Sequence, residues 1–145
     1  MSELILKTNS LIKYFESTKG FFGGDKTLVK AVDGIDVEIY KGETVGLVGE
    51  SGCGKTTAGR TITKLYEPTS GSIIFDGEEI SNLNQRQMKP LRSKLQMIFQ
   101  DPYSSLNPRK TIGDIISAPI EIHKINKSVS RKAQVQESPS GSPEP

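Results

Sequence analysis

The chain has 145 residues, which is enough for one modest domain with a hydrophobic core. Its 19 basic and 17 acidic side chains give a formal charge of only +2, so no global field draws it to nucleic acid or to an anionic membrane. Cys53 is the only cysteine, which excludes an internal disulfide bond and suits a reducing compartment. The N-terminus shows no secretory signal, and no run of about 18 apolar residues could span a bilayer, so we expect no direct membrane insertion.

The first third of the chain predicts an antiparallel sheet. We expect strands at residues 4–15, 27–32 and 35–40. A glycine-bearing turn or loop at residues 20–26 follows the first of these strands. Asp33-Gly34 lies between the other two and is typical of a hairpin turn, and Lys41-Gly42 predicts another turn.

The segment Gly49-Glu50-Ser51-Gly52-Cys53-Gly54-Lys55-Thr56 fits the phosphate-binding pattern G-x-x-x-x-G-K-[ST] at every fixed position. An apolar run at residues 43–48 predicts a buried strand before it, and residues 55–65 predict a helix after it. Glycines let backbone N–H groups turn inward around phosphate oxygens, and the helix N-terminus favours an anion. Lys55 would reach the β- and γ-phosphates, while the Thr56 hydroxyl would hold Mg²⁺. The alternative is a glycine-rich strand-to-helix turn without a ligand, in which Cys53 is a small filler.

Beyond this helix, Pro68 and Gly71 indicate a helix stop and a turn. A hairpin is expected next, with strands at 72–75 and 78–80 joined by Asp76-Gly77. The apolar run that ends at Asp76 also resembles a strand carrying an Mg²⁺-directed carboxylate, but the Asp-Gly pair favours a turn.

The last third predicts mixed short elements. We expect a short helix at 84–89 that ends before Pro90, a strand at 95–99, a loop at 103–109, and a helix at 112–116 that Thr111 caps and Pro119 ends. His123, the only histidine, has no neighbours that indicate a metal or a catalytic partner. Residues 128–137 could begin another helix. The tail Ser138–Pro145 has three prolines and no large apolar residue, which predicts disorder.

Three blocks of the sequence carry a resemblance to one family. They are Lys41–Thr57, Glu67–Ile73 with Asp76-Gly77, and Gln96–Arg109. From about Leu4 to Glu137 the chain resembles the ATP-binding subunits of ABC transporters. The third block, with the insertion around residues 21–24, is similar to the oligopeptide and dipeptide importers among them.

The resemblance implies an α/β fold of the P-loop NTPase class, the ABC nucleotide-binding domain. Its antiparallel β-subdomain and partial RecA-like core would occupy residues 1–137, before the disordered tail 138–145, and the chain would stop ahead of the helical subdomain. The expected ligands are ATP and Mg²⁺. The expected partners are transmembrane permease subunits and a second ATP-binding subunit, with no nucleic acid, so the protein would lie on the cytoplasmic face of the cell membrane, held there through the permease.

Site residues follow from the same resemblance, position by position. Gln100 would be the glutamine that touches Mg²⁺ and the attacking water and senses the permease, although it could equally be an ordinary strand end. Phe15, with Tyr14 as the alternative, would stack on adenine, or would be a plain core residue. The residues expected to bind ATP are Phe15, Gly49, Glu50, Ser51, Gly52, Cys53, Gly54, Lys55, Thr56, Thr57 and Gln100, and those expected to bind Mg²⁺ are Thr56 and Gln100.

The departures from the family concern catalysis. The sequence contains no Leu-Ser-Gly-Gly-Gln signature and no Asp-Glu dipeptide, and the latter would supply the base and part of the Mg²⁺ coordination. We therefore expect no catalytic residue in this chain, and ATP binding without hydrolysis. The tail from Ser138 indicates a shifted reading frame or an artificial terminus. Two alternatives stay open: a soluble ABC-type ATPase of translation or repair, and a non-catalytic nucleotide-binding fragment.

Overall fold

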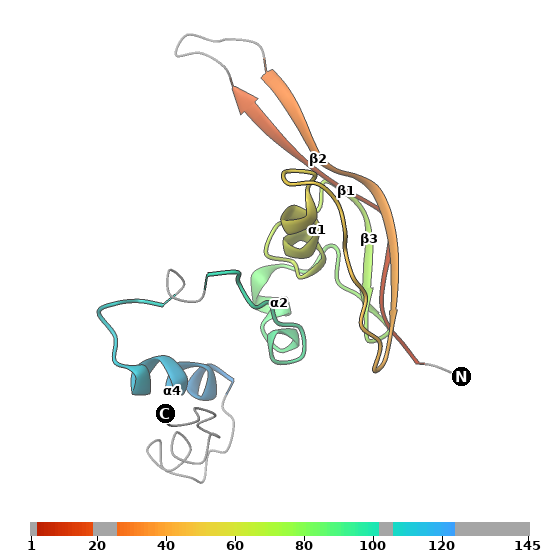
Figure 1. Ribbon diagram of the computed structural model, residues 1–145. Helices are drawn as coiled ribbons and strands as arrows, with labels where there is room; N and C mark the ends of the chain where they lie inside the picture. Colours follow the sequence, from red (N-terminus) through yellow and green to blue (C-terminus); the bar gives the residue numbers. More distant parts are fainter. Residues whose placement is uncertain (1–2, 19–25, 102–105, 124–145) are drawn as a thin grey trace. The chain divides into compact units, whose positions relative to one another are not determined.

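Two long strands, β1 (Leu4–Thr18) and β2 (Lys26–Tyr40), form the frame of the fold in the computed structural model. The structure describes residues 3–18, 26–101 and 106–123 (Figure 1). It divides into two compact units, residues 1–97 and 98–145, which are described in turn. The predicted domain boundary at residue 137, the helix at 128–137 and the tail lie outside the described residues. So does the loop predicted at 20–26, apart from Lys26, which begins β2.

The sheet of the first unit has the strand order β2-β1-β3-β4 and is antiparallel throughout. Strand β3 (Ser70–Phe75) pairs with the first half of β1, and β4 (Glu78–Glu79) pairs with the end of β3. Beyond Ile12, β1 pairs with β2 alone, so the two strands continue as a two-stranded ribbon that leaves the sheet (Figure 1). The predicted antiparallel sheet is confirmed.

Asp33-Gly34 is a bulge inside β2. Ile35 pairs with Leu11 and Asp33 pairs with Ile12, so Gly34 is an extra residue between two neighbouring pairs. Its φ of 75° lies in the left-handed region that glycine adopts without strain. The prediction of two strands joined by a hairpin turn is wrong here, because β1 offers a continuous partner on both sides of the bulge.

The turn between β3 and β4 is as predicted. Asp76 and Gly77 have φ values of 53° and 80°, the mirror-image turn that suits the twist of a two-residue hairpin. The Asp76 carboxylate accepts a hydrogen bond from Lys94 Nζ at 2.7 Å. Asp76 is therefore a turn residue, as the sequence predicted, and its carboxylate is paired with the Lys94 ammonium.

The core of this unit lies on one face of the sheet. It consists of six buried side chains, Leu6, Leu11, Ile73, Phe75, Ile80 and Met88. Met88 comes from helix α2 (Gln85–Met88), which Asn84 caps by accepting hydrogen bonds from the N–H groups of Arg86 and Gln87. The short 3₁₀ helix η1 (Leu91–Ser93) follows Pro90. The predicted short helix before Pro90 is confirmed.

Helix α1 (Lys55–Ile62) directly follows the glycine-rich loop and packs against β1 and β2. It ends three residues earlier than expected, because Lys64 takes a left-handed φ of 56°. Ala58 and Thr61 are its buried residues. The helix is therefore a two-turn element whose position depends on what holds its ends.

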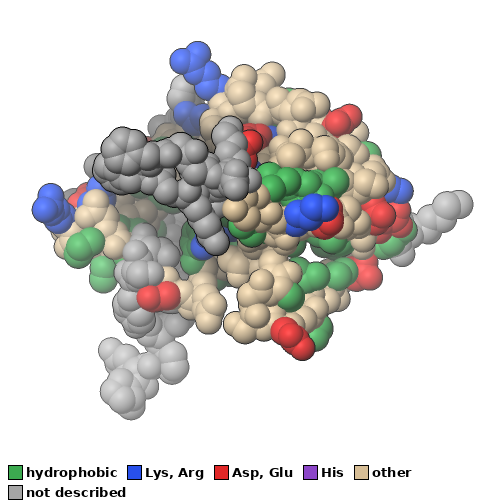
Figure 2. Space-filling view, turned by 90° about the horizontal axis from the view of Figure 1, so that it is seen from above, with side chains coloured by type: hydrophobic (Ala, Val, Ile, Leu, Met, Phe, Trp, Pro, Cys, Tyr) green, Lys and Arg blue, Asp and Glu red, His purple; other side chains and the backbone are tan. Residues whose placement is uncertain are grey.

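Two of the predicted strands are absent from the described chain. Residues 43–50 and 95–99 are irregular, and in them Val45, Leu47, Val48 and Ile98 are 46%, 54%, 92% and 95% exposed. Figure 2 shows hydrophobic side chains open to solvent on the viewed face. Both predictions are wrong for the same reason: an apolar run becomes a strand only beside a partner strand, and none of the described strands runs beside them.

The second unit contains helix α4 (Ile112–Ile122). Thr111 caps it, accepting a hydrogen bond from Asp114 N at 3.2 Å, as predicted. The helix continues past Pro119 for three residues, so the prediction that Pro119 ends it is wrong. Proline removes one N–H from the helix, but its own carbonyl still accepts a bond from His123 N at 3.0 Å, which continues the ladder. Among the described residues, no helix has the length and apolar character needed to cross a bilayer.

Candidate functional site: the phosphate loop

Glycines let the loop at residues 49–54 fold closely on itself and on β2. A Cβ atom at Gly54 would lie 2.1 Å from the carbonyl oxygen of Ala31, and Gly54 has a φ of 95°. A Cβ atom at Gly49 would lie 2.6 Å from Cys53 Sγ. Any side chain at position 54 would therefore push the start of α1 away from β2. The carbonyl of Ala31 is a part of the site that the sequence did not reveal.

Lys55 places its ammonium group at the centre of the loop. Its Nζ donates hydrogen bonds to the carbonyl oxygens of Gly49 at 2.7 Å and Glu50 at 2.5 Å. The thiol of Cys53, at 3.6 Å, is only a weak acceptor for the same group. An ammonium has three N–H donors, so one of them remains for a stronger acceptor such as a phosphate oxygen. The loop holds a cation where the motif requires one.

The N-terminus of α1 opens onto the same loop. The first N–H groups of a helix have no partner within it, and here Ala58 N is the first to bond inside the turn, to Gly54 O at 2.8 Å. The first turn has no acidic residue that would neutralise the positive end of the helix dipole. Thr56 is exposed in this turn, and Thr57 is half-buried, with its backbone carbonyl oxygen accepting a hydrogen bond from the Thr61 hydroxyl at 2.8 Å. The arrangement favours an anion at the loop.

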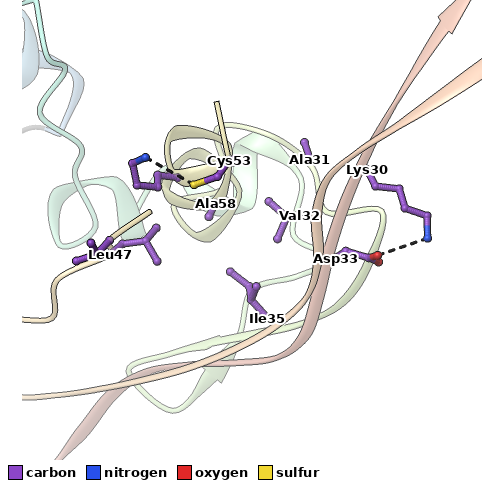
Figure 3. A pocket seen from close by; sticks show the side chains of 11 residues that line it. Lys30, Ala31, Val32, Asp33, Ile35, Leu47, Cys53 and Ala58 are labelled. Atoms are coloured by element: carbon purple, nitrogen blue, oxygen red, sulfur yellow. Dashed lines mark hydrogen bonds and ion pairs between the residues drawn. The ribbon is translucent and has the colours of Figure 1, made fainter. Parts of the chain in front are cut away.

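A cavity of about 300 Å³ adjoins the loop (Figure 3). Its walls come from three parts of the chain: the end of the loop with the start of α1, residues 30–35 of β2, and Leu47 with Val48. Val32, Ile35 and Ala58 supply apolar side chains, while Lys30 and Asp33 form an ion pair at its outer side, 3.4 Å apart. The space beside the phosphate loop is therefore mainly apolar.

Phe15 and Tyr14 do not line this cavity. The Phe15 ring meets the Tyr66 ring edge-on, with centroids 5.5 Å apart, and Lys13 Nζ lies 4.9 Å from its centre. The Tyr14 hydroxyl donates to the Asp33 carboxylate, a bond that lowers the pKa of Asp33 and raises the pKa of Tyr14. Phe15 thus has a packing role in the structure, and its stacking on adenine stays a prediction.

Gln100 belongs to the second unit, where its side chain is exposed. The phosphate loop lies in the first unit. The contact of Gln100 with Mg²⁺ therefore stays a prediction. Within the described residues no three histidine, cysteine or acidic side chains gather into a metal site.

Comparisons with known proteins agree on one family. The ABC transporter family model matches residues 32–141. The chain is 48% identical over 136 residues to the oligopeptide transport ATP-binding protein AppF of Bacillus subtilis, covering 93% of the chain and 41% of that protein. It is 47% identical over 135 residues to OppF of the same organism, covering 92% of the chain and 42% of that protein. The chain thus spans about two fifths of the length of these relatives.

Among solved structures, the dimeric ATP-binding cassette MJ0796 in a post-hydrolysis state bound to ADP and phosphate matches with a TM-score of 0.72. The match covers 91% of this chain and 55% of that one, at 22% identity. A second dimeric structure of the same cassette matches with a TM-score of 0.71 at 22% identity. At 22% identity these matches show only the fold of the chain, which is that of an ABC cassette.

Proposed function

Since the chain belongs to the ABC transporter family, we propose that it binds ATP with Mg²⁺ through residues 49–57, as part of the ATP-binding subunit of an oligopeptide importer. The observation that carries the proposal is the Lys55 ammonium, held by two loop carbonyls at 2.7 and 2.5 Å beside the open N-terminus of α1. A polyphosphate placed there meets a fixed cation and several unpaired N–H groups at once.

Each residue of the loop then has a defined role. Gly49 and Gly54 allow the close approach of the backbone, and Lys55 would bind the β- and γ-phosphates. The N–H of Cys53 donates to Glu50 O at 3.3 Å, so the other N–H groups of the loop and of the first turn of α1 would donate to the phosphates. Thr56 would supply its hydroxyl oxygen to Mg²⁺, and Gln100 would supply its side-chain amide oxygen. Mg²⁺ would neutralise part of the phosphate charge, and the protein residues orient the chain of phosphates.

The oligopeptide assignment is supported by identities of 47–48% across more than nine tenths of the chain. Through it we propose permease subunits and a second ATP-binding subunit as partners, and a location at the cytoplasmic face of the membrane. The block Gln100–Arg109 favours an importer over a soluble ABC-type ATPase. The 145 residues contain no Asp-Glu dipeptide, so we propose that by themselves they bind ATP and do not hydrolyse it.

Calorimetric titration of the 145-residue chain with Mg-ATP tests the proposal. Lys55→Met keeps the length of the side chain but removes its charge, and we expect a loss of affinity of about a hundredfold. Lys89→Met is the matched control, because Lys89 is an exposed lysine next to α2 and away from the loop. Equal affinities for the Lys55→Met and Lys89→Met variants would refute the assigned role of the loop.

The binding-only part of the proposal has its own assay. Phosphate release from Mg-ATP is measured with the unmodified chain and with the Lys55→Met variant. We expect no difference between the two, because the base that positions water is missing. Phosphate release that disappears in the Lys55→Met variant would show that the chain is itself an ATPase.

A further inference from the structure

The C-terminal end of α1 is held by a guanidinium group from elsewhere in the chain. Arg92, in η1, donates from Nη1 to the carbonyl oxygen of Thr63 at 2.5 Å and from Nη2 to that of Lys64 at 2.8 Å. Nη2 also approaches Gln85 Oε1 at 3.3 Å. These two carbonyls follow the last turn of the helix, where a cation also complements the negative end of the dipole. Arg92 therefore acts as a cap on α1.

Lys64 makes the reciprocal connection. Its side chain is fully buried, and its Nζ donates to Ser81 O at 2.6 Å and to the carboxylate of Glu67. Ser81 in turn accepts a hydrogen bond from Ile73 N at 2.7 Å through its hydroxyl, which ties the contact to β3. Two cationic side chains thus connect the end of α1 with the segment at residues 81–92. Lys64 reaches from the end of α1 to Ser81, and Arg92 reaches back to Thr63 and Lys64. A buried lysine and a forked arginine resist small displacements of the helix along its axis.

The opposite end of the helix carries the phosphate loop. Eight helical residues span about 12 Å, so the bonds of Arg92 are made at the end of α1 opposite to Lys55. A helix of this length is unstable by itself, and this one buries only Ala58 and Thr61. Its position is therefore fixed at its two ends, by Gly54 against β2 and by the contacts of Lys64 and Arg92.

We propose that Arg92 is a positioning residue for phosphate binding. By fixing the end of α1, it keeps the first-turn N–H groups and Lys55 directed at one point in the loop. Without its two bonds the helix shifts or frays from its C-terminal end, and the donors at its N-terminus no longer converge. The inference rests on the proposed nucleotide site and adds a residue outside the motif to it.

The test measures binding of inorganic tripolyphosphate and of Mg-ATP to the 145-residue chain by calorimetry, well below the melting temperature of every variant. Arg92→Gln is expected to weaken the binding of both ligands by about tenfold. Both ligands depend on the same N–H groups and the Lys55 ammonium to bind their phosphates. Arg92→Lys keeps the charge and one of the two bonds, so we expect it to restore part of the affinity.

Two controls separate positioning from stability. Arg86→Gln removes an exposed guanidinium from the neighbouring α2 and is expected to bind as the unmodified chain does. Leu6→Val lowers stability by removing a methylene from the core, without touching the Arg92 bonds, and is expected to leave affinity unchanged while the protein is folded.

The outcomes are distinct. Unaltered affinity of Arg92→Gln, with the unmodified chain binding, overturns this inference alone. A loss that Leu6→Val reproduces, or that Arg92→Lys does not relieve, also overturns it, because the effect then follows stability and not the fork of hydrogen bonds. Absence of binding by the unmodified chain refutes the nucleotide site and this inference together.

Discussion

Gly54→Ala should damage this fold far more than the same substitution two residues earlier. A Cβ atom at position 54 would lie 2.1 Å from the Ala31 carbonyl oxygen, so α1 and β2 would have to separate by about 1.4 Å to restore a normal contact of about 3.5 Å. The φ of 95° adds backbone strain for any residue with a Cβ. Together we expect the free energy of unfolding to fall by about 3 kcal/mol.

Gly52→Ala separates the two effects. Gly52 has a φ of 83°, but nothing lies within 4 Å of its added Cβ, so only the strain of about 1–2 kcal/mol remains. Urea unfolding followed by circular dichroism gives both values, and the Gly54→Ala variant should also lose affinity for Mg-ATP. Equal losses of stability in the two variants would mean that the close approach of Gly54 to Ala31 does not hold α1, and the reasoning would fail.

Three further predictions concern stability. Gly59→Ala should raise the free energy of unfolding by about 0.5–1 kcal/mol, because the added methyl meets only Met97 Cε at 3.8 Å in a helix interior; a lower urea midpoint would contradict this. Asn84→Ala should cost about 1 kcal/mol through loss of the cap of α2, with a Ser variant expected to recover most of it. The bond from Lys94 lowers the pKa of Asp76, so its contribution to stability is present above the ordinary value of 3.8 and is lost as pH falls below it. Melting curves of Asp76→Asn and the unmodified chain should therefore converge at acid pH, and a difference that does not vary with pH would exclude this linkage.

The local elements of the fold were predictable because their causes are local. The turn at Asp76-Gly77, the short helix before Pro90 and the cap at Thr111 depend on a few neighbouring residues, and the structure shows them. The strands expected at 43–48 and 95–99 needed a partner from elsewhere, and their apolar pattern contains no information about whether one is present. Asp-Gly suits a hairpin turn and a bulge equally well, so Asp33-Gly34 could not be resolved without knowing the register of β1.

The candidate site divides in the same way. The motif alone identified Lys55 and the glycines of the loop. In the structure the Lys55 ammonium donates to the carbonyl oxygens of Gly49 and Glu50. The Ala31 carbonyl, the buried Lys64 and Arg92 were not predicted, because backbone contacts and the burial of a charged side chain follow from tertiary packing. No sequence motif indicates that the Arg92 guanidinium donates to the carbonyl oxygens of Thr63 and Lys64 at the end of α1.

The bulge at Gly34 shifts by one residue the alternation of β2 side chains between the two faces of the sheet. In a regular strand, residues 32 and 35 would point to opposite faces, because side chains alternate with a period of two. The additional residue lets Val32 and Ile35 both point into the cavity beside α1 (Figure 3). Deleting Gly34 would therefore turn the side chains of one half of β2 to the opposite face of the sheet. The number of residues in this segment thus matters as much as their identity.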